Sequence, residues 1–443
     1  VYTSNNNTFQ NIQASNNYHG FRFIGSGSTF QNIQVSYNNF IGLSIIGSSN
    51  TLQNITANNN EEGIFVTSFG GISSNNTISS STVYSNTNGL YLSGSNNTVQ
   101  NIQAYNNSYA GLYIFGTNNT IQNITAFSNT QYGLLLRFLS GSTIQNIIAN
   151  NSNGVGLRLL DSSSNTLQNI NASFNKYGGV SLENSHNNIL QNIKASYNST
   201  LFASNGVGLS GSNNNILQNI QASSHSSVGV GLSGSNNNIL QNITANSNGY
   251  HGFTFYYSNN NILQNITANN NRGVSYGRGL DLYVSHNNTF QSITANNNPY
   301  GFYISSSWYN NLSSITANNN SQYGLYIVSS KKNTLSSSTL ISNAYGVYLY
   351  SNSPNNTIFN NYFNNTINAH DTGINYWNIT KTRGKNIMGG PYLGGNFWHD
   401  YNGTDTNWDG IGDTNLPYNS NRNIQNGGDY LPLVVLKPRI SSR

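Results

Sequence analysis

One short line of sequence recurs along most of this chain. It reads NNTFQNIQA from residue 6, NNTIQNITA from residue 118, and NNILQNITA from residue 237 and again from residue 260. The isoleucine of its QNI motif returns mostly after about 21–23 residues, a period typical of solenoids. A unit this short cannot bury its own apolar side chains, so neighbouring units must stack to form a continuous core.

Apolar side chains two positions apart occur in each repeat, as at Leu90 and Leu92 or at Leu280 and Leu282. A period of two places them on one face of a short strand. Asn clusters and a Gly separate these segments, and both residue types tolerate the left-handed backbone of tight corners. We therefore predict an all-β fold, a single-stranded parallel β-helix with three short strands per turn and about 16 turns of about 22–23 residues.

A column of asparagines accompanies the repeat. An Asn falls five residues after the QNI isoleucine in nearly every turn, and Ser152 and His225 interrupt the series. We expect each side-chain amide to bond to the amide of the next turn. The column comprises Asn17, Asn38, Asn60, Asn107, Asn129, Asn175, Asn198, Asn248, Asn271, Asn298 and Asn320.

The repeat line resembles the right-handed β-helix repeats of NosD-like and carbohydrate-binding/sugar-hydrolase (CASH) proteins, which many archaeal surface proteins carry. The resemblance extends over about residues 5–365 and implies a right-handed helix. We divide the chain into β-helix repeats over residues 1–365 and a C-terminal capping segment over residues 366–443. The same fold serves enzymes, adhesins and structural proteins, so the resemblance specifies function poorly.

The NosD resemblance also suggests copper transport, and the residues argue against it. Copper sites use Cys, Met or clustered His. The chain has no Cys, one Met and seven scattered His. His186 and His286 each precede an Asn pair at a corner, which favours polar turn residues over metal ligands.

The C-terminal segment contains GGNFWHDYNGTDTNWDGIGDTNLPYN (residues 394–419) and resembles the closing segment of NosD-like proteins. Three of the four Trp lie in this part of the chain, at Trp377, Trp398 and Trp408. Solenoids need terminal caps because an open strand edge invites aggregation. We expect this segment to cover the last turn.

Within the segment, DTNWDGIGD matches the first part of an EF-hand loop. Leu416 stands where the bidentate Glu would be, so the loop resembles dockerin-type or thrombospondin-type calcium loops instead. We predict a Ca²⁺ site here, with a plain Asp/Asn/Gly turn as the alternative. The ligands would be Asp405, Asn407, Asp409, the carbonyl of Ile411, and Asp413.

Acidic residues are scarce, since only 6% of the chain is charged against a usual value of about 25%. Of the acids in the repeats, Asp161 and Glu183 occupy similar places in adjacent turns and form the best candidate catalytic pair. Arg158 offers a simpler role for them, a surface ion pair. We therefore predict no catalytic residues and no enzymatic activity, with a polysaccharide lyase or hydrolase as the alternative.

Tyrosines form an outward stripe. Some precede the repeat Gly, at Tyr132, Tyr323 and Tyr345, and others sit between inward strand positions, at Tyr113, Tyr303, Tyr326 and Tyr348. Stacked Tyr can bind sugars or pack against another molecule. Stabilisation of the strand face is the reading we favour.

N-x-S/T sequons are frequent, and they predict N-linked glycans if the chain is secreted. Alternation within the repeat aims Asn54, Asn123, Asn242 and Asn265 outward. The candidate sites are Asn6, Asn54, Asn75, Asn96, Asn106, Asn118, Asn123, Asn150, Asn171, Asn198, Asn242, Asn265, Asn287, Asn311, Asn319, Asn355, Asn364, Asn378 and Asn402.

These features favour a secreted, glycosylated structural protein of an archaeal surface, a filament, sheath or surface-layer subunit whose signal peptide has been removed. Copies would join head to tail through the first turn and the apolar tail, at Val1, Tyr2, Leu431, Leu433, Val434, Val435 and Leu436. A tail strand packed on its own chain is the alternative. Scattered Lys and Arg argue against nucleic acid, and no apolar run reaches the ~18 residues of a membrane span. The alternative function is a carbohydrate-binding or polysaccharide-degrading β-helix protein.

Overall fold

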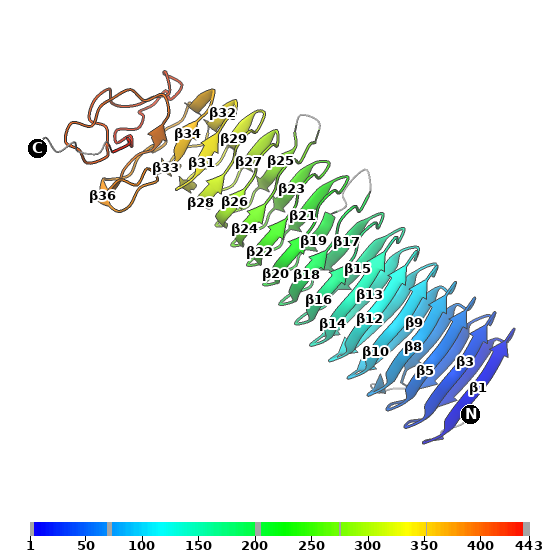
Figure 1. Cartoon of the computed structure of the whole chain (residues 1–443). Coiled ribbons are helices and arrows are strands. Elements are labelled where there is room, and N and C mark those ends of the chain that lie inside the picture. The colour runs from blue at the N-terminus through cyan, green and yellow to red at the C-terminus, as the bar shows by residue number, and fades with distance from the viewer. Residues whose placement is uncertain (1–3, 69–72, 200–204, 274–275, 351, 437–443) are drawn as a thin grey trace, which may run out of the picture. The chain divides into compact units, whose positions relative to one another are not determined.

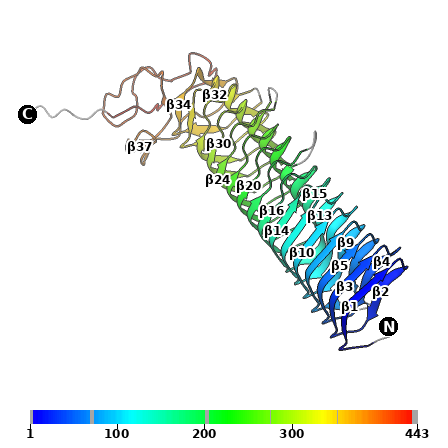
Figure 2. The ribbon, with the colours of Figure 1, turned by 45° about the vertical axis from the view of Figure 1, so that its right-hand side comes forward.

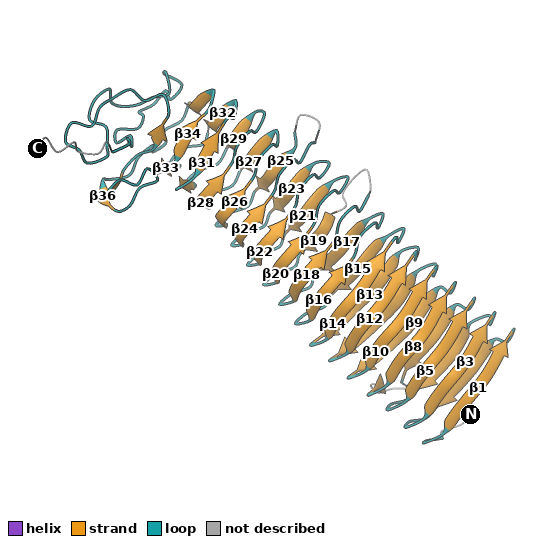
Figure 3. Cartoon of the chain, in the orientation of Figure 1, coloured by secondary structure: helices purple, strands orange, loops and turns teal. Residues whose placement is uncertain are grey.

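The computed structural model describes residues 4–68, 73–199, 205–273, 276–350 and 352–436. Residues 1–231 and 232–443 form two compact units, which are described separately. Every regular element in the described residues is a β-strand (Figure 3). Within each unit the strands stack turn upon turn as a parallel β-solenoid (Figures 1 and 2). The predicted right-handed parallel β-helix is confirmed, with about 15 turns rather than 16.

Two parallel sheets run through the first unit, and we name them after their sequence marks. The QNI sheet holds β1 (Thr8–Ser15), β3 (Thr29–Ser36), β5 (Thr51–Asn58), β8 (Thr77–Tyr84), β10 (Thr98–Tyr105), β12 (Thr120–Phe127), β14 (Thr143–Asn150), β16 (Thr166–Asn171), β18 (Ile189–Lys194) and β20 (Ile216–Gln221). The Gly sheet holds β2 (His19–Ile24), β4 (Ile41–Ile46), β6 (Glu62–Thr67), β7 (Ser73–Ser74), β9 (Asn88–Ser95), β11 (Ala110–Thr117), β13 (Tyr132–Ser140), β15 (Val155–Leu160), β17 (Gly178–Glu183), β19 (Asn205–Ser210) and β21 (Val228–Ser233).

The second unit contains the same two kinds of sheet. Its QNI-type strands are β22 (Ile239–Thr244), β24 (Ile262–Thr267), β26 (Thr289–Thr294), β28 (Asn311–Thr316), β30 (Thr334–Ser336), β31 (Thr339–Ile341), β33 (Thr357–Phe359), β34 (Tyr362–Asn364) and β38 (Phe397–Trp398). Its Gly-sheet strands are β23 (His251–Tyr256), β25 (Arg278–Tyr283), β27 (Tyr300–Ser305), β29 (Tyr323–Val328), β32 (Tyr345–Leu349) and β35 (Ile367–Asp371), and β36 (Thr382–Arg383) pairs antiparallel with β37 (Tyr392–Leu393).

Strands of successive turns pair in register, so equivalent residues stack. Ile266 of β24 lies opposite Ile293 of β26, and Leu280 of β25 lies opposite Phe302 of β27. These four inward side chains are at most 1% exposed. The two-residue period thus builds a column of apolar side chains along each inner strand position, as the sequence predicted.

Left-handed residues make the corners. Asn11 has φ of 56° in the middle of β1, and the pairing of β1 with β3 skips it. At the equivalent place in a later turn, Ser337 (φ 52°) separates β30 from β31. Most turns therefore contain two strands rather than the predicted three, with the QNI strand bent at an Asn or Ser corner, and among the described residues only the late turns divide it, as β30 and β31 or β33 and β34.

Two buried asparagine ladders run along the corners. The predicted column is confirmed in both units: the amide of Asn107 donates to Asn129 Oδ1 at 2.9 Å and that of Asn248 to Asn271 Oδ1 at 3.0 Å. A second ladder, which the sequence analysis missed, occupies another corner and includes the bond from Asn261 to Asn288 at 3.1 Å. Such bonds satisfy backbone and amide groups that would otherwise be buried without partners.

The C-terminal segment packs against the end of its own unit. Trp377 and Trp398 are each 1% exposed, and their indole N–H groups donate to Asp371 at 3.0 Å and Asp429 at 2.8 Å. Backbone pairing of β38 with β34 joins the segment to the solenoid. Trp408 is 50% exposed and takes no part in this core.

Candidate functional site

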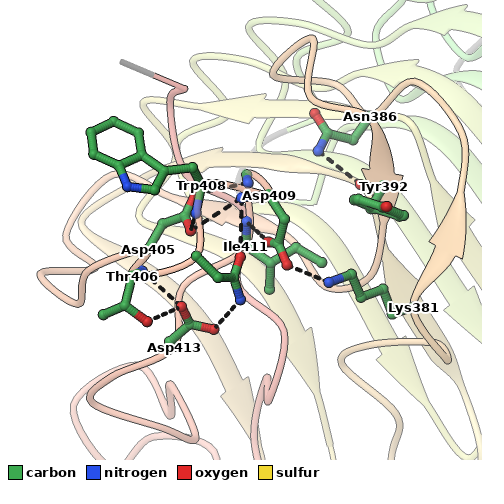
Figure 4. A network of polar contacts seen from close by, with 11 residues as sticks. Lys381, Asn386, Tyr392, Asp405, Thr406, Trp408, Asp409, Ile411 and Asp413 are labelled. Atoms are coloured by element: carbon green, nitrogen blue, oxygen red, sulfur yellow. Dashed lines mark hydrogen bonds and ion pairs between the residues drawn. The ribbon is translucent and has the colours of Figure 1, made fainter. Parts of the chain in front are cut away.

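The predicted calcium loop forms a hydrogen-bonded turn (Figure 4). Asp405 accepts the backbone N–H groups of Trp408 at 2.6 Å and Gly410 at 2.8 Å. Asp413 accepts the hydroxyl of Thr406 at 2.6 Å, and the backbone N–H of Ile411 donates to Asp409. The carboxylates thus already serve as acceptors inside the loop.

Calcium does not fit this arrangement as it stands. The ammonium group of Lys381 pairs with Asp409, and the amide of Asn407 points to Asp413 as a donor at 3.2 Å. In the described part of the chain, no three His, Cys, Asp or Glu side chains gather to hold a metal ion. The same holds for copper, for which the chain also lacks Cys. The calcium site stays a prediction.

The apolar tail lies on the cap. Leu433 is fully buried and bridges to Phe397, and the N–H of Val434 donates to the carbonyl of Gly410 at 3.1 Å. Val435 and Leu436 are exposed. Val1, Tyr2 and residues 437–443 lie outside the described residues, so assembly through the ends stays a prediction.

Most sequon asparagines are exposed corner residues, and the outward direction of Asn54, Asn123, Asn242 and Asn265 is confirmed. Asn150, Asn171, Asn364 and Asn378 are partly exposed. Asn198 is an exception, because it is 1% exposed and accepts the N–H of Asn175 at 2.7 Å within the buried ladder. A glycan does not fit at Asn198 in the folded chain.

The candidate catalytic pair of the first unit is engaged in ion pairs. Arg158 pairs with Glu183 and donates to the hydroxyl of Tyr132 at 2.6 Å. Arg137 lies 3.9 Å from Asp161. Both carboxylates are partly exposed and face a guanidinium, which is the arrangement of surface ion pairs rather than of an acid and base poised over a substrate.

Tyrosines form two columns on the outer face of the Gly sheet in the second unit. The first column stacks Tyr300, Tyr323 and Tyr345 with ring centroids 5.0 and 5.3 Å apart. A second column holds Tyr303, Tyr326, Tyr348 and His370, and we call the residues of the two columns the tyrosine face. All of its members are partly exposed. The expected outward tyrosine stripe is confirmed.

The second column stacks Tyr303, Tyr326, Tyr348 and His370. Successive ring centroids lie 5.3, 5.3 and 4.3 Å apart, with planes within 16° of parallel. The two columns meet edge to face, as between Tyr323 and Tyr326 at 4.9 Å. In-register pairing of β27, β29, β32 and β35 sets this repeat.

The hydroxyl groups of the tyrosine face are available to a ligand. Among the described residues, no side chain or backbone group bonds to the hydroxyls of Tyr300, Tyr303, Tyr323, Tyr326, Tyr345 or Tyr348. Burial and the neighbouring phenols raise the pKa of Tyr326 to about 12, so its hydroxyl stays protonated at neutral pH. The face therefore offers apolar ring edges and hydrogen-bond donors side by side.

A buried carboxyl group lies at the start of the columns. Asp281 of β25 sits opposite Tyr303 of β27 and is 2% exposed. Its Oδ2 lies 2.7 Å from Arg278 Nη1 and 3.8 Å from His251 Nε2. Its Oδ1 is buried without a hydrogen-bond partner in the described residues.

The neighbours of Asp281 hold it in place. Arg278 lies over the ring of Tyr303, 3.6 Å from its centroid. His251 Nδ1 accepts the backbone N–H of Arg278 at 3.2 Å, which leaves the ring proton on Nε2, toward Asp281. Burial raises the pKa of Asp281, and Arg278 opposes this rise. Burial lowers the pKa of His251 to about 3, so the ring is neutral.

A search of the described residues finds no helix long and apolar enough to cross a membrane. Two family models match the chain. Residues 205–403 match one described as periplasmic copper-binding protein (NosD), and residues 72–200 match one described as right handed beta helix region. No curated protein sequence matches the chain.

Solved structures with a similar fold include the A-module of mannuronan C-5 epimerase AlgE6 from Azotobacter vinelandii (13% identity, 80% of this chain and 91% of that one, TM-score 0.45). A substituted form of the periplasmic alginate epimerase AlgG is similar at 14% identity (63% and 78%, TM-score 0.47). The enzymatically active domain of tailspike protein 2 of bacteriophage CBA120 is similar at 14% identity (60% and 43%, TM-score 0.38).

The prediction that the chain is not an enzyme is not kept, since the solved structures described above are named as epimerases and as an enzymatically active domain; their likeness assigns no activity to this chain. Scarce carboxylates suggested inactivity, yet one well-placed acid is enough for proton transfer. At this identity the likeness bears on the fold alone. The choice of site and ligand must come from this chain's own residues.

Proposed function

We propose that this chain, which belongs to the NosD-like family of right-handed β-helix proteins, binds and chemically alters a polysaccharide at the tyrosine face. One observation carries the proposal. Two in-register columns of partly exposed tyrosines, with hydroxyls that have no partner in the described residues, lead to a buried carboxyl group at Asp281.

A repeating surface suits a repeating ligand. Each turn adds an equivalent pair of phenols at the inter-strand spacing of ~4.8 Å. Tyrosine supplies apolar contact area and a hydrogen-bond donor at low entropic cost, which matches the alternation of C–H and hydroxyl groups on sugars. Because the sheet already fixes the rings, binding orders few side chains.

Asp281 is the group that we propose performs the chemistry. Its Oδ2 is held by Arg278 and faces His251, whereas Oδ1 is buried without a partner in the described residues. Once a bound chain uncovers Oδ1, this carboxylate oxygen would take a proton from a water as the water adds to the anomeric carbon, and would pass that proton to the glycosidic oxygen as its bond to that carbon breaks. Most glycoside hydrolases use two carboxyl groups. On the described tyrosine face Asp281 has no second carboxylate beside it, so Arg278 and His251 act as positioning residues for a single acid.

We place the protein outside the cytoplasm, which the periplasmic description of the family matching residues 205–403 supports. Occupied sequons, bound calcium and head-to-tail assembly remain proposals beside this one. The burial of Leu433 on the cap supports a tail packed on its own chain.

The test combines binding and product formation. The protein is incubated with a panel of soluble polysaccharides, and new reducing ends are measured together with polymer length. Asp281→Asn is expected to abolish product formation and to keep binding. Asp161→Asn, a change at an acid that directly follows β15 in the first unit, is the matched control and is expected to change neither. An Asp281→Asn variant as active as wild type would refute the assignment of Asp281.

A further inference from the structure

One pair of charged groups lies beside the tyrosine face in the described residues. Arg278 and Asp281 lie 2.7 Å apart, with side chains 18% and 3% exposed. The other polar members in the described residues are tyrosine hydroxyls and the rings of His251 and His370. His370 stacks on Tyr348 at 4.3 Å. The positive charge of Arg278 is thus offset by the carboxylate of Asp281.

The guanidinium of Arg278 pairs with Asp281 through Nη1, whereas its Nε is buried without a hydrogen-bond partner in the described residues. The guanidinium faces Asp281, and its Cζ lies 3.6 Å from the ring centroid of Tyr303 and 5.9 Å from that of Tyr300. A carboxylate or sulfate on a sugar would lose water against the phenols, and Arg278, the cation described beside them, already pairs with Asp281. Such desolvation costs free energy unless a charged or hydrogen-bonding partner replaces the water.

Three further cations of the repeats lie in turns outside the tyrosine columns. Lys331 and Lys332 occupy the turn between β29 and β30, where their ammonium groups lie 4.7 Å over Trp308 and 5.2 Å over Tyr309. Arg272 is exposed in the turn that precedes β25. These three cations thus lie outside the two tyrosine columns.

We infer, building on the proposed function, that the polysaccharide bound by the tyrosine face is uncharged. Neutral sugar hydroxyls can exchange hydrogen bonds with the phenol hydroxyls, while C–H groups contact the ring edges. Binding of this kind depends little on salt, because no charge is neutralised.

Electrophoresis of the full chain through native gels tests the inference. Gels contain a neutral polymer (hydroxyethyl cellulose, galactomannan or dextran) or an anionic one (alginate or polygalacturonate), at low and at high salt. We expect a neutral polymer to retard the protein equally at both salt concentrations. Tyr326→Ala should weaken this retardation about tenfold, the usual effect of truncating a central aromatic contact.

The control variants are Lys331→Ala with Lys332→Ala, and Arg272→Ala. Retardation by an anionic polymer that these variants abolish, with neutral binding kept, would support the inference. Stronger retardation by an anionic polymer that Tyr326→Ala weakens and the controls leave unchanged would overturn the inference and keep the proposed function. No retardation by any polymer would overturn both.

Discussion

Arg278 and Asp281 form an ion pair at the position where the tyrosine columns begin, with 2.7 Å between Nη1 and Oδ2. The pair is buried on the outer side of a sheet, where repeats normally place solvent-facing side chains. Two charged groups are costly to bury, and their mutual contact offsets that cost only while both are present. Apolar side chains of similar volume would stabilise the fold at this position at least as well, so the presence of the ion pair favours a functional role.

Breaking this pair should destabilise the second unit strongly. We predict that Arg278→Met lowers stability by about 3 kcal/mol, because it leaves Asp281 buried without its cation. The double variant Arg278→Met with Asp281→Asn should recover most of the loss. Thermal melting followed by circular dichroism measures both. A double variant as unstable as the single one would show that packing of Arg278, and not charge, is responsible.

The first buried asparagine ladder should contribute more to stability than an exposed Asn–Asn bond such as that between Asn265 and Asn242. Asn271 Oδ1 accepts the N–H and the amide of Asn248, both at 3.0 Å, and its own amide donates to Asn298. Asn271→Ala leaves the N–H and amide groups of Asn248 without their acceptor and should lower the free energy of unfolding by about 1–3 kcal/mol.

The matched control for this ladder is Asn265→Gly. Asn265 is exposed, has φ of 55° and donates to Asn242 at 3.2 Å. Glycine tolerates that backbone, so the change should stay within about 0.5 kcal/mol. Equal melting temperatures for the two variants would contradict a stabilising role for the buried ladder.

Ionisation of Glu62 should make the first unit less stable in mild alkali than in mild acid. Burial raises its pKa from 4.5 to about 7, partly offset by the hydrogen bond from Asn88 at 2.9 Å. The folded state therefore holds the proton more tightly, so the stabilising contribution is complete below pH 4.5 and is lost as pH rises through about 7.

Melting temperatures at about pH 5 and about pH 8 check this linkage. Glu62→Gln should flatten the decline, whereas Glu61→Gln, a change at its exposed neighbour, should retain most of it. An identical pH dependence in wild type and Glu62→Gln would exclude Glu62 as the titrating group.

In the predicted calcium loop, the ammonium group of Lys381 competes with Ca²⁺ for Asp409. Calcium binding predicts heat in titration calorimetry and a higher melting temperature. Lys381→Met should strengthen binding, because Asp409 then loses its ammonium partner. Absence of heat in both proteins, together with melting that EDTA leaves unchanged, would refute the calcium site and leave the loop as a turn.

Much of the fold follows from the sequence because a solenoid turns sequence period into spatial register. Tyr303, Tyr326 and Tyr348 hold the same place in successive repeats, so their stacking could be predicted from spacing alone. The second asparagine ladder was missed because the corners are so rich in Asn that an inward column does not stand out from its neighbours.

The charged centre could not be predicted in the same way. Asp281 meets His251 only across an interval of irregular length, since extra residues lie before β25. Its burial depends on Arg278 folding over Tyr303, which no sequence period encodes. Counting acidic residues therefore suggested inactivity, although local geometry makes one of them unusual.

The most direct test of the account is calorimetric measurement of polysaccharide affinity in two matched tyrosine variants. One removes the stacked pair Tyr303 and Tyr326 of the tyrosine face. The other removes Tyr84 and Tyr105, which stack at 5.0 Å on the QNI sheet of the first unit. The account predicts at least about tenfold weaker binding for Tyr303→Ala with Tyr326→Ala and unchanged binding for the control pair. Equal affinities in both variants would contradict it.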